Sequence, residues 1–242
     1  KRDGGDWVVN GTKHFISAAD HADFIIVFIA TGEDDTPKGP KKRITAFLVD
    51  RGTPGFEIAP GYNCVSHRGY KNCILRFEDC RLPDAQVLGE VDGCFAVMNE
   101  WLYATRITVA AMSVGRARRV FDYALNYAAE RKQFGQPIGK FQVLQHRMVD
   151  MFMEHEQSKS LLYMAAMRLD EGYDQAARKA VSALKVQIGK SGRFVGENAI
   201  QLHGGMGMTE EMSIGHYFKR LTIIDTLFGS ADYHLRKYAR VA

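Results

Sequence analysis

Proline is almost absent from the second part of this chain. Five of the six prolines precede residue 84, and from Gly93 onward only Pro137 remains. A proline inside a helix removes a hydrogen bond and clashes with the preceding turn, so its absence permits long helices. Apolar residues recur there at helical spacing, for example Leu144, Met148 and Met151. The pattern predicts long helices over 93–130, 138–171 and 174–202 and shorter ones over 212–226 and 231–241, packed as an antiparallel four-helix bundle.

The first part of the chain has the opposite pattern, with short β-type runs separated by turn residues. The Asn10-Gly11 pair predicts a hairpin, and the Gly-, Asp-, Pro- and Lys-rich stretch 31–42 predicts a solvated loop. The predicted strands are 7–9, 13–17, 24–29, 44–49, 56–59 and 73–77. The fold class is therefore α+β: an N-terminal antiparallel β domain over 1–88, followed by a helical bundle domain over 89–242.

Composition excludes several classes of protein. The 242 residues are 46% hydrophobic, and the net charge of +4 comes without any long Lys/Arg run, so nothing marks a nucleic-acid-binding protein. The apolar run Phe24–Ala30 is too short to span a membrane, and the N-terminal residues do not resemble a signal peptide. The four cysteines lack C-x-x-C spacing, which favours reduced thiols in the cytoplasm or, in a eukaryote, the mitochondrial matrix.

Two segments stand out in the helical part. Arg131 follows a long predicted helix and is accompanied by Gln133 and Phe134; it is either a solvated cation near a helix end or a fork for a phosphate group. The Gly204-Gly205 pair after Gln201-Leu202-His203 is either an ordinary helix cap or a place where a ligand approaches the backbone. His203 has no second histidine or carboxylate at ligand spacing, so no metal site is predicted.

Together these two segments resemble the flavin-binding motifs of the acyl-CoA dehydrogenase family, and the resemblance runs from Trp7 to the C-terminus. It implies bound FAD. The segment Phe15-Ile16-Ser17 is similar to the family's Trp-Ile-Thr, and strand alternation places Phe15 and Ser17 on one side, with an apolar face and a hydroxyl beside the flavin ring. The cofactor-binding residues implied by the resemblance are Phe15, Ile16, Ser17, Arg131, Gln133, Phe134, Phe141, Gln142, Gln201, Leu202, His203, Gly204, Gly205, Ser230 and Asp232. In the family, the residue that matches Arg131 reaches a flavin held by a neighbouring subunit.

The same resemblance implies α,β-desaturation of an acyl-CoA thioester, in which a carboxylate takes the α proton and hydride passes to the flavin. Both positions from which the family draws that carboxylate differ here. Phe228 occupies one, within Leu-Phe-Gly-Ser, and Thr105 the other, within Tyr-Ala-Thr-Arg. The catalytic base is therefore unassigned, and Asp225 and Asp232 are either displaced bases or solvated helix-terminal residues. The substrate contacts implied by the resemblance are Tyr103, Thr105, Arg106, Phe228 and Gly229, although Arg106 could equally form an ion pair.

The missing carboxylate leaves two alternative functions open. One is a non-catalytic, FAD-supporting subunit of a hetero-oligomeric dehydrogenase, and the other is a flavin-dependent monooxygenase or oxidase on the same scaffold. The implied partners are an acyl-CoA substrate, an electron-transfer flavoprotein or similar acceptor, and further subunits of a homo- or hetero-tetramer.

Overall fold

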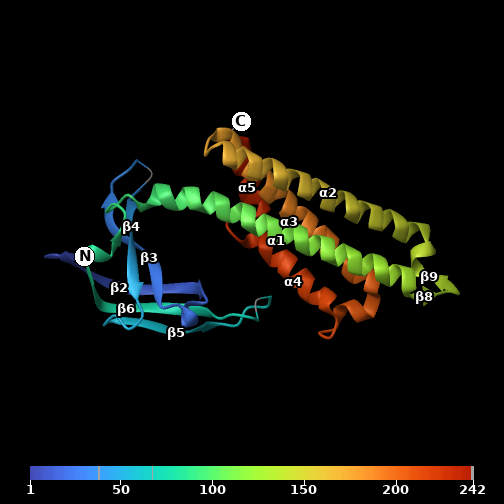
Figure 1. Ribbon diagram of the computed structural model, residues 1–242, viewed down its shortest axis with the longest axis horizontal. Coiled ribbons are helices and arrows are strands. Elements are labelled where there is room, and N and C mark those ends of the chain that lie inside the picture. The colour runs from blue at the N-terminus through green and yellow to red at the C-terminus, as the bar shows by residue number, and fades with distance from the viewer. Residues whose placement is uncertain (38, 67, 241–242) are drawn as a thin grey trace. The chain divides into compact units, whose positions relative to one another are not determined.

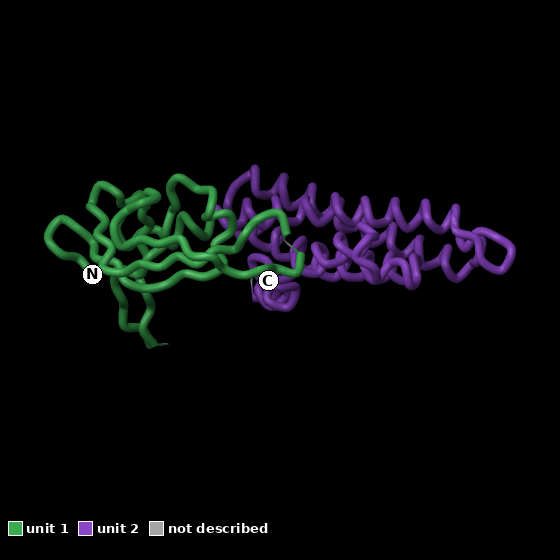
Figure 2. The backbone as a smooth tube through the Cα atoms, turned by 90° about the horizontal axis from the view of Figure 1, so that it is seen from below, with its two compact units in different colours: residues 1–100 green, residues 101–242 purple. Residues whose placement is uncertain are grey.

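The computed structural model describes residues 1–37, 39–66 and 68–240. The chain divides into two compact units, Lys1–Glu100 and Trp101–Ala242 (Figure 2). The first is built of antiparallel sheets and the second of helices, as Figure 1 shows. The predicted α+β class, a β part followed by a helical part, is confirmed.

Unit 1 contains two antiparallel sheets. The first has the order β1-β2-β6-β5, and the second β3-β4-β7. Their strands are β1 (Arg2–Asp3), β2 (Asp6–Ser17), β3 (Phe24–Asp34), β4 (Lys41–Asp50), β5 (Phe56–Tyr62), β6 (Asn72–Pro83) and β7 (Val87–Leu88). Both sheets contribute to one core, in which Trp7 of β2 packs edge-on against Phe47 of β4 with ring centroids 5.7 Å apart.

One local prediction for this unit is wrong, and a second gives a loop that is too long. Asn10-Gly11 is no hairpin turn but lies inside the continuous strand β2, at a bulge opposite β6. At the bulge, the Asn10 side chain forms a hydrogen bond with Asp79: the backbone amide of Asp79 donates to Asn10 Oδ1 at 2.8 Å. Only residues 35–40 of the expected loop over 31–42 lie between strands, because β3 and β4 keep pairing as far as Asp34 and Lys41. Opposite charges face each other across this extension, which favours pairing.

Unit 2 consists of α1 (Cys94–Glu130), whose first turns belong to unit 1, α2 (Gln142–Glu171), α3 (Gln175–His203), α4 (Ser213–Thr226) and α5 (Ala231–Arg240). Sequence signals fix their ends: the Asp174 carboxylate caps α3 by accepting from Ala177 N at 2.8 Å. Gly204, with φ 59°, ends the same helix in the left-handed region. Two apolar clusters bury the facing sides of the helices, one around Val120 and Val195 and the other around Val109 and Leu184.

The strands end at Leu88, where the sequence places a domain boundary, yet the compact units divide after Glu100. The first turns of α1 belong to unit 1 because two contacts tie them there. Gly93 bridges to Ile44 of β4, and the ammonium of Lys41 lies 6.0 Å from the centre of the Phe95 ring.

Within the described ranges, no helix combines the length and apolar character needed to cross a membrane. In the same residues, no group of three or more His, Cys, Asp or Glu side chains could hold a metal ion.

Candidate functional site

The aromatic–hydroxyl pair of unit 1 lies at an irregular point of β2. The register against β6 shifts between Lys13 and Ile16, and Phe15 there has a left-handed backbone with φ 59°. Ile16 still turns toward the core, whereas Phe15 and Ser17 are both exposed. The regular alternation from which a common side for Phe15 and Ser17 was predicted is therefore interrupted at this point of the strand.

The contacts of this pair leave one face of the aromatic ring free for a ligand. Phe15 stacks on Tyr62 with centroids 4.7 Å apart, yet 64% of its surface stays exposed. The Ser17 hydroxyl donates to Asn72 Oδ1 at 3.0 Å, so its lone pairs remain available as acceptors. Asn72 in turn donates to the Cys64 sulfur at 2.8 Å.

Arg131 lies at the junction of α1 and a small hairpin of β8 (Lys132–Gln133) and β9 (Gln136–Pro137). Its backbone accepts from Ile138 N at 2.8 Å, and its side chain is exposed. Phe134 at the hairpin tip has φ 54° and is 91% exposed. Its ring meets that of Phe141 edge-on at 6.1 Å, and Gln142 starts the next helix beside it. The hairpin therefore presents a cation and an uncovered ring.

The end of α3 combines a buried and an open part. Leu202 and His203 are buried, and the His203 ring stacks on Tyr127 of α1 with centroids 4.3 Å apart. Its Nδ1 lies 2.8 Å from the carbonyl oxygen of Ala199 and must carry the proton of that bond, because a carbonyl only accepts. Gly204 and Gly205 are exposed, and an added Cβ would meet no atom within 4 Å at either. Gln201 is exposed on the same turn.

The turn between α4 and α5 holds Phe228 and Gly229, both with positive φ, 57° and 105°. The Phe228 carbonyl accepts two hydrogen bonds, from Arg106 Nε at 3.0 Å and from His234 Nε2 at 3.1 Å. The Phe228 side chain is 37% exposed, so it is presented outward rather than packed in the core.

Lys185 and His234 were not predicted as site residues. Lys185 on α3 is fully buried and donates from Nζ to the carbonyls of Ile224 at 3.1 Å and Leu227 at 2.8 Å. Burial lowers its pKa to about 8, opposed by the charge of Asp225. The sequence signal for its burial is a lysine among the apolar residues Val181, Leu184 and Ile188, which recur at helical spacing.

His234 on α5 is fully buried as well. Desolvation lowers its pKa to about 4, so the ring is neutral near pH 7. A neutral imidazole carries one proton, and the bond to the Phe228 carbonyl places it on Nε2. A histidine surrounded by Arg106, Lys185 and Lys237 is therefore a fixed donor rather than a proton shuttle.

The two candidate carboxylates differ in their contacts. The Asp225 Oδ1 accepts from the backbone of Ala231 at 2.9 Å, bridging the turn to the start of α5. Asp232 is exposed in the first turn of α5, where a negative charge favours the helix dipole. Ser230 supplies an oxygen that accepts from Tyr233 N at 3.3 Å.

Tyr103 and Arg106 lie next to each other, and Arg106 also contacts the Phe228 turn. The Arg106 guanidinium lies 5.0 Å from the centre of the buried Tyr103 ring, and Tyr173 packs edge-on against that ring at 4.9 Å. Burial raises the pKa of Tyr103. The Thr105 hydroxyl donates a hydrogen bond within α1, to the carbonyl oxygen of Trp101 at 3.1 Å.

Unit 2 thus gathers its predicted site residues into two groups. The hairpin and the end of α3 share one apolar cluster, to which Phe141 and Leu202 both contribute. The Phe228 turn and Arg106 form the other group. Because α1 rises about 1.5 Å per residue, Arg106 and Arg131, which directly follows the helix, are separated by about 38 Å along the helix direction. A single chain does not bring Arg131 to the Phe228 turn.

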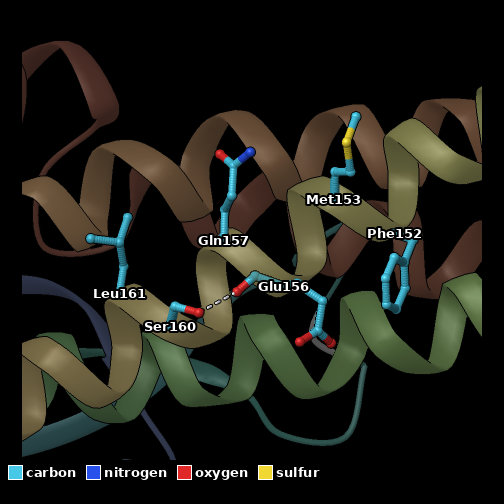
Figure 3. A pocket seen from close by; sticks show the side chains of 6 residues that line it. All are labelled: Phe152, Met153, Glu156, Gln157, Ser160 and Leu161. Carbon is cyan, nitrogen blue, oxygen red and sulfur yellow. Dashed lines mark hydrogen bonds between the residues drawn. The ribbon is translucent and has the colours of Figure 1, made fainter.

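The outer side of α2 forms a shallow groove of a different character, shown in Figure 3. Its lining side chains come from α2 alone: Phe152, Met153, Glu156, Gln157, Ser160 and Leu161. The Ser160 hydroxyl is used within the helix, on the Glu156 carbonyl at 2.9 Å. Phe152 also approaches Phe121 of α1 with centroids 5.9 Å apart. The groove suits packing against an apolar surface rather than chemistry.

Comparison with known proteins matches both parts of the chain. The description "Acyl-CoA dehydrogenase, middle domain" matches residues 1–80, and "Acyl-CoA dehydrogenase, C-terminal domain" matches residues 92–242. The human mitochondrial short-chain specific acyl-CoA dehydrogenase is 33% identical over 232 residues, which are 96% of this chain and 55% of that protein.

Solved structures agree with this match. Butyryl-CoA dehydrogenase from Megasphaera elsdenii superimposes with a TM-score of 0.89 at 31% identity, covering 99% of this chain and 61% of that one. The FAD complex of PigA gives a TM-score of 0.89 at 28% identity, covering 99% and 61%. The chain thus spans little more than half the length of the relatives it matches. On the match of its middle and C-terminal domains, the chain belongs to the acyl-CoA dehydrogenase family.

Proposed function

We propose that this chain is part of an FAD-dependent, acyl-CoA dehydrogenase-like oxidoreductase that desaturates an acyl-CoA thioester between its α and β carbons. The observation that carries the proposal is the family match of both parts of the chain together with the exposed Phe15 ring and the nearby Ser17 hydroxyl. Residues 1–88 would supply the middle β domain and 89–242 the helical domain of that enzyme.

The residues present fit FAD. Phe15 and Phe134 are largely exposed apolar rings, and the exposed Arg131 offers a fork that suits a pyrophosphate. The open space around Gly204 and Gly205 leaves their backbone accessible to a ligand. When bound, FAD supplies an acceptor for the hydride that leaves the β carbon.

The α proton needs a base that this site does not obviously provide. Phe228 has no group that can accept a proton, and Thr105 is engaged within its own helix. The contact of Asp225 with Ala231 N supports a structural role for that carboxylate. Of the two aspartates, the exposed Asp232 is thus the freer candidate.

The lack of an evident catalytic base favours one alternative, a subunit that supports FAD in a hetero-oligomer while a related chain supplies the base. An oxidase or monooxygenase on the same scaffold would need no thioester base and is the second alternative. In either case, the turn would hold Phe228 as an apolar contact for the ligand.

The separation of Arg131 from the Phe228 turn supports an oligomer. A second copy, or a related subunit in a tetramer, would bring Arg131 to a flavin held by its neighbour. The apolar groove on α2 offers a surface for such packing. The four cysteines are free, in keeping with a reducing compartment such as the cytoplasm or mitochondrial matrix, and an electron-transfer flavoprotein or similar protein would accept the electrons.

Reconstitution of the full chain with FAD, followed by anaerobic addition of butyryl-CoA, tests these alternatives. Bleaching of the flavin absorbance is expected for a dehydrogenase, and its loss in Asp232→Asn with FAD retained would identify the base. Bleaching that appears only in Phe228→Glu would assign the chain as a partner subunit. Oxygen uptake without another acceptor would indicate an oxidase. If the chain retains no flavin, or retains FMN instead of FAD when both are offered, the proposal is contradicted.

A further inference from the structure

Carbonyl oxygens in the last turn of α4 and in the turn that follows it accept hydrogen bonds from side chains of three other helices. The last carbonyls of a helix have no partner within it. Lys185 of α3 donates to Ile224 O and Leu227 O, at 3.1 and 2.8 Å. Arg106 of α1 and His234 of α5 both donate to Phe228 O. All three donors are buried.

Two glycines let the turn approach its neighbours closely. A Cβ on Gly229 would lie 2.6 Å from Tyr233 Cδ1 and 2.9 Å from His234 Nε2. A Cβ on Gly189 of α3 would overlap the Asp225 carboxylate. The turn is therefore fitted against both α3 and α5, and small movements of it are opposed from two sides.

The conformation of Phe228 requires such support. Its φ of 57° lies in the left-handed region, which bulky residues rarely adopt, and such strain persists only where the surroundings hold it. Its side chain is 37% exposed and belongs to none of the apolar clusters. Core packing of the ring does not hold this backbone, whereas the hydrogen bonds to the carbonyls do.

We infer that Lys185 and His234 are positioning residues: with Arg106 they lock the turn so that residue 228 projects into the ligand site in one fixed orientation. The inference rests on the proposed function, which makes position 228 part of an acyl-CoA site. Lys185 and His234 touch the turn's backbone and act on the ligand only through it.

Fluorine NMR of the full chain labelled with 4-fluorophenylalanine tests the inference directly. The resonance of Phe228 is assigned as the one absent from Phe228→Leu. The parent should give one sharp Phe228 resonance, and Lys185→Met and His234→Leu should split or broaden it while the remaining phenylalanine signals stay in place. His234→Gln, whose amide can donate in place of Nε2, should restore the single line.

Ser191→Ala is the matched control, because it removes a buried hydrogen bond of α3, to Ser158 at 2.7 Å, without touching the turn. If it disturbs the Phe228 line as much as Lys185→Met does, the effect is general loosening and the inference is overturned. The same holds if the Phe228 line is unchanged in Lys185→Met and His234→Leu. Should Lys185→Met fail to fold, the His234→Leu and His234→Gln pair decides alone.

Titration with butyryl-CoA in the presence of FAD separates this inference from the proposed function. A shift of the parent's Phe228 line, with weaker binding in His234→Leu and recovery in His234→Gln, supports both. A Phe228 line that responds to the substitutions but not to butyryl-CoA leaves the locked turn intact and overturns its place in an acyl-CoA site.

Discussion

Because the amino group of Lys185 is buried, the free energy of unfolding of the chain should vary with pH in the alkaline range. Burial lowers the pKa of Lys185 from 10.5 to about 8. Between these two values the unfolded chain binds the proton more tightly than the folded chain. The free energy of unfolding therefore rises with pH across this window, and the gain is lost as pH falls back to about 8.

The size of the effect follows from the shift in pKa. One proton contributes about 1.4 kcal/mol per pH unit, so the whole window corresponds to about 3 kcal/mol. Between pH 8 and 9.5 the expected rise is about 2 kcal/mol. Below pH 8 Lys185 is protonated in both states, and its contribution is constant.

Urea unfolding of the parent and of Lys185→Met at a series of pH values measures this contribution, because other titrating groups cancel in the difference. The stability of the parent relative to the variant should increase between pH 8 and 9.5. Lys190→Met removes an exposed lysine of the same helix and serves as the control. Parallel curves for the parent and Lys185→Met would refute the lowered pKa of Lys185, and so would a stability of the parent relative to the variant that falls as pH rises.

Three further substitutions test the site. Arg131→Ala is expected to weaken FAD binding by about 1.5 to 3 kcal/mol, the range for hydrogen bonds to charged groups; an unchanged affinity in a fluorescence titration would leave Arg131 a surface cation. Asp225→Ala should lower the free energy of unfolding by about 1 to 2 kcal/mol, because Ala231 N loses its acceptor, whereas Asp232→Ala should cost less; equal urea midpoints for the two would contradict the contact. Gly229→Ala should cost about 1 to 3 kcal/mol through strain, with Gly205→Ala, which meets open space, as the control; similar melting temperatures for both would argue against the close approach of His234.

Much of the helical part was predictable because its signals are local. The scarcity of proline and the spacing of apolar residues depend on a few neighbouring positions, and the predicted 174–202 helix corresponds to α3 (Gln175–His203). The glycine end of α3 follows in the same way from a short motif.

The errors arose where strand pairing overrode a local signal. Asn10-Gly11 is a typical hairpin pair, but hydrogen bonds between Asn10 and Asp79, far along the chain, hold it within β2. The polar composition of 31–42 predicts a loop, yet Asp34 and Lys41 pair across the end of β3 and β4.

The sequence by itself determined the two-part fold, the family and the absence of a carboxylate at position 228. Tertiary structure alone decided how that position is held. Arg106, Lys185 and His234 lie on three helices, far apart in the sequence, and nothing local to any of them indicates that they meet at one turn. A hydrogen bond to a backbone carbonyl does not require any particular residue as its acceptor, because every residue has the same carbonyl group. Such bonds therefore cannot be predicted from the sequence of the turn.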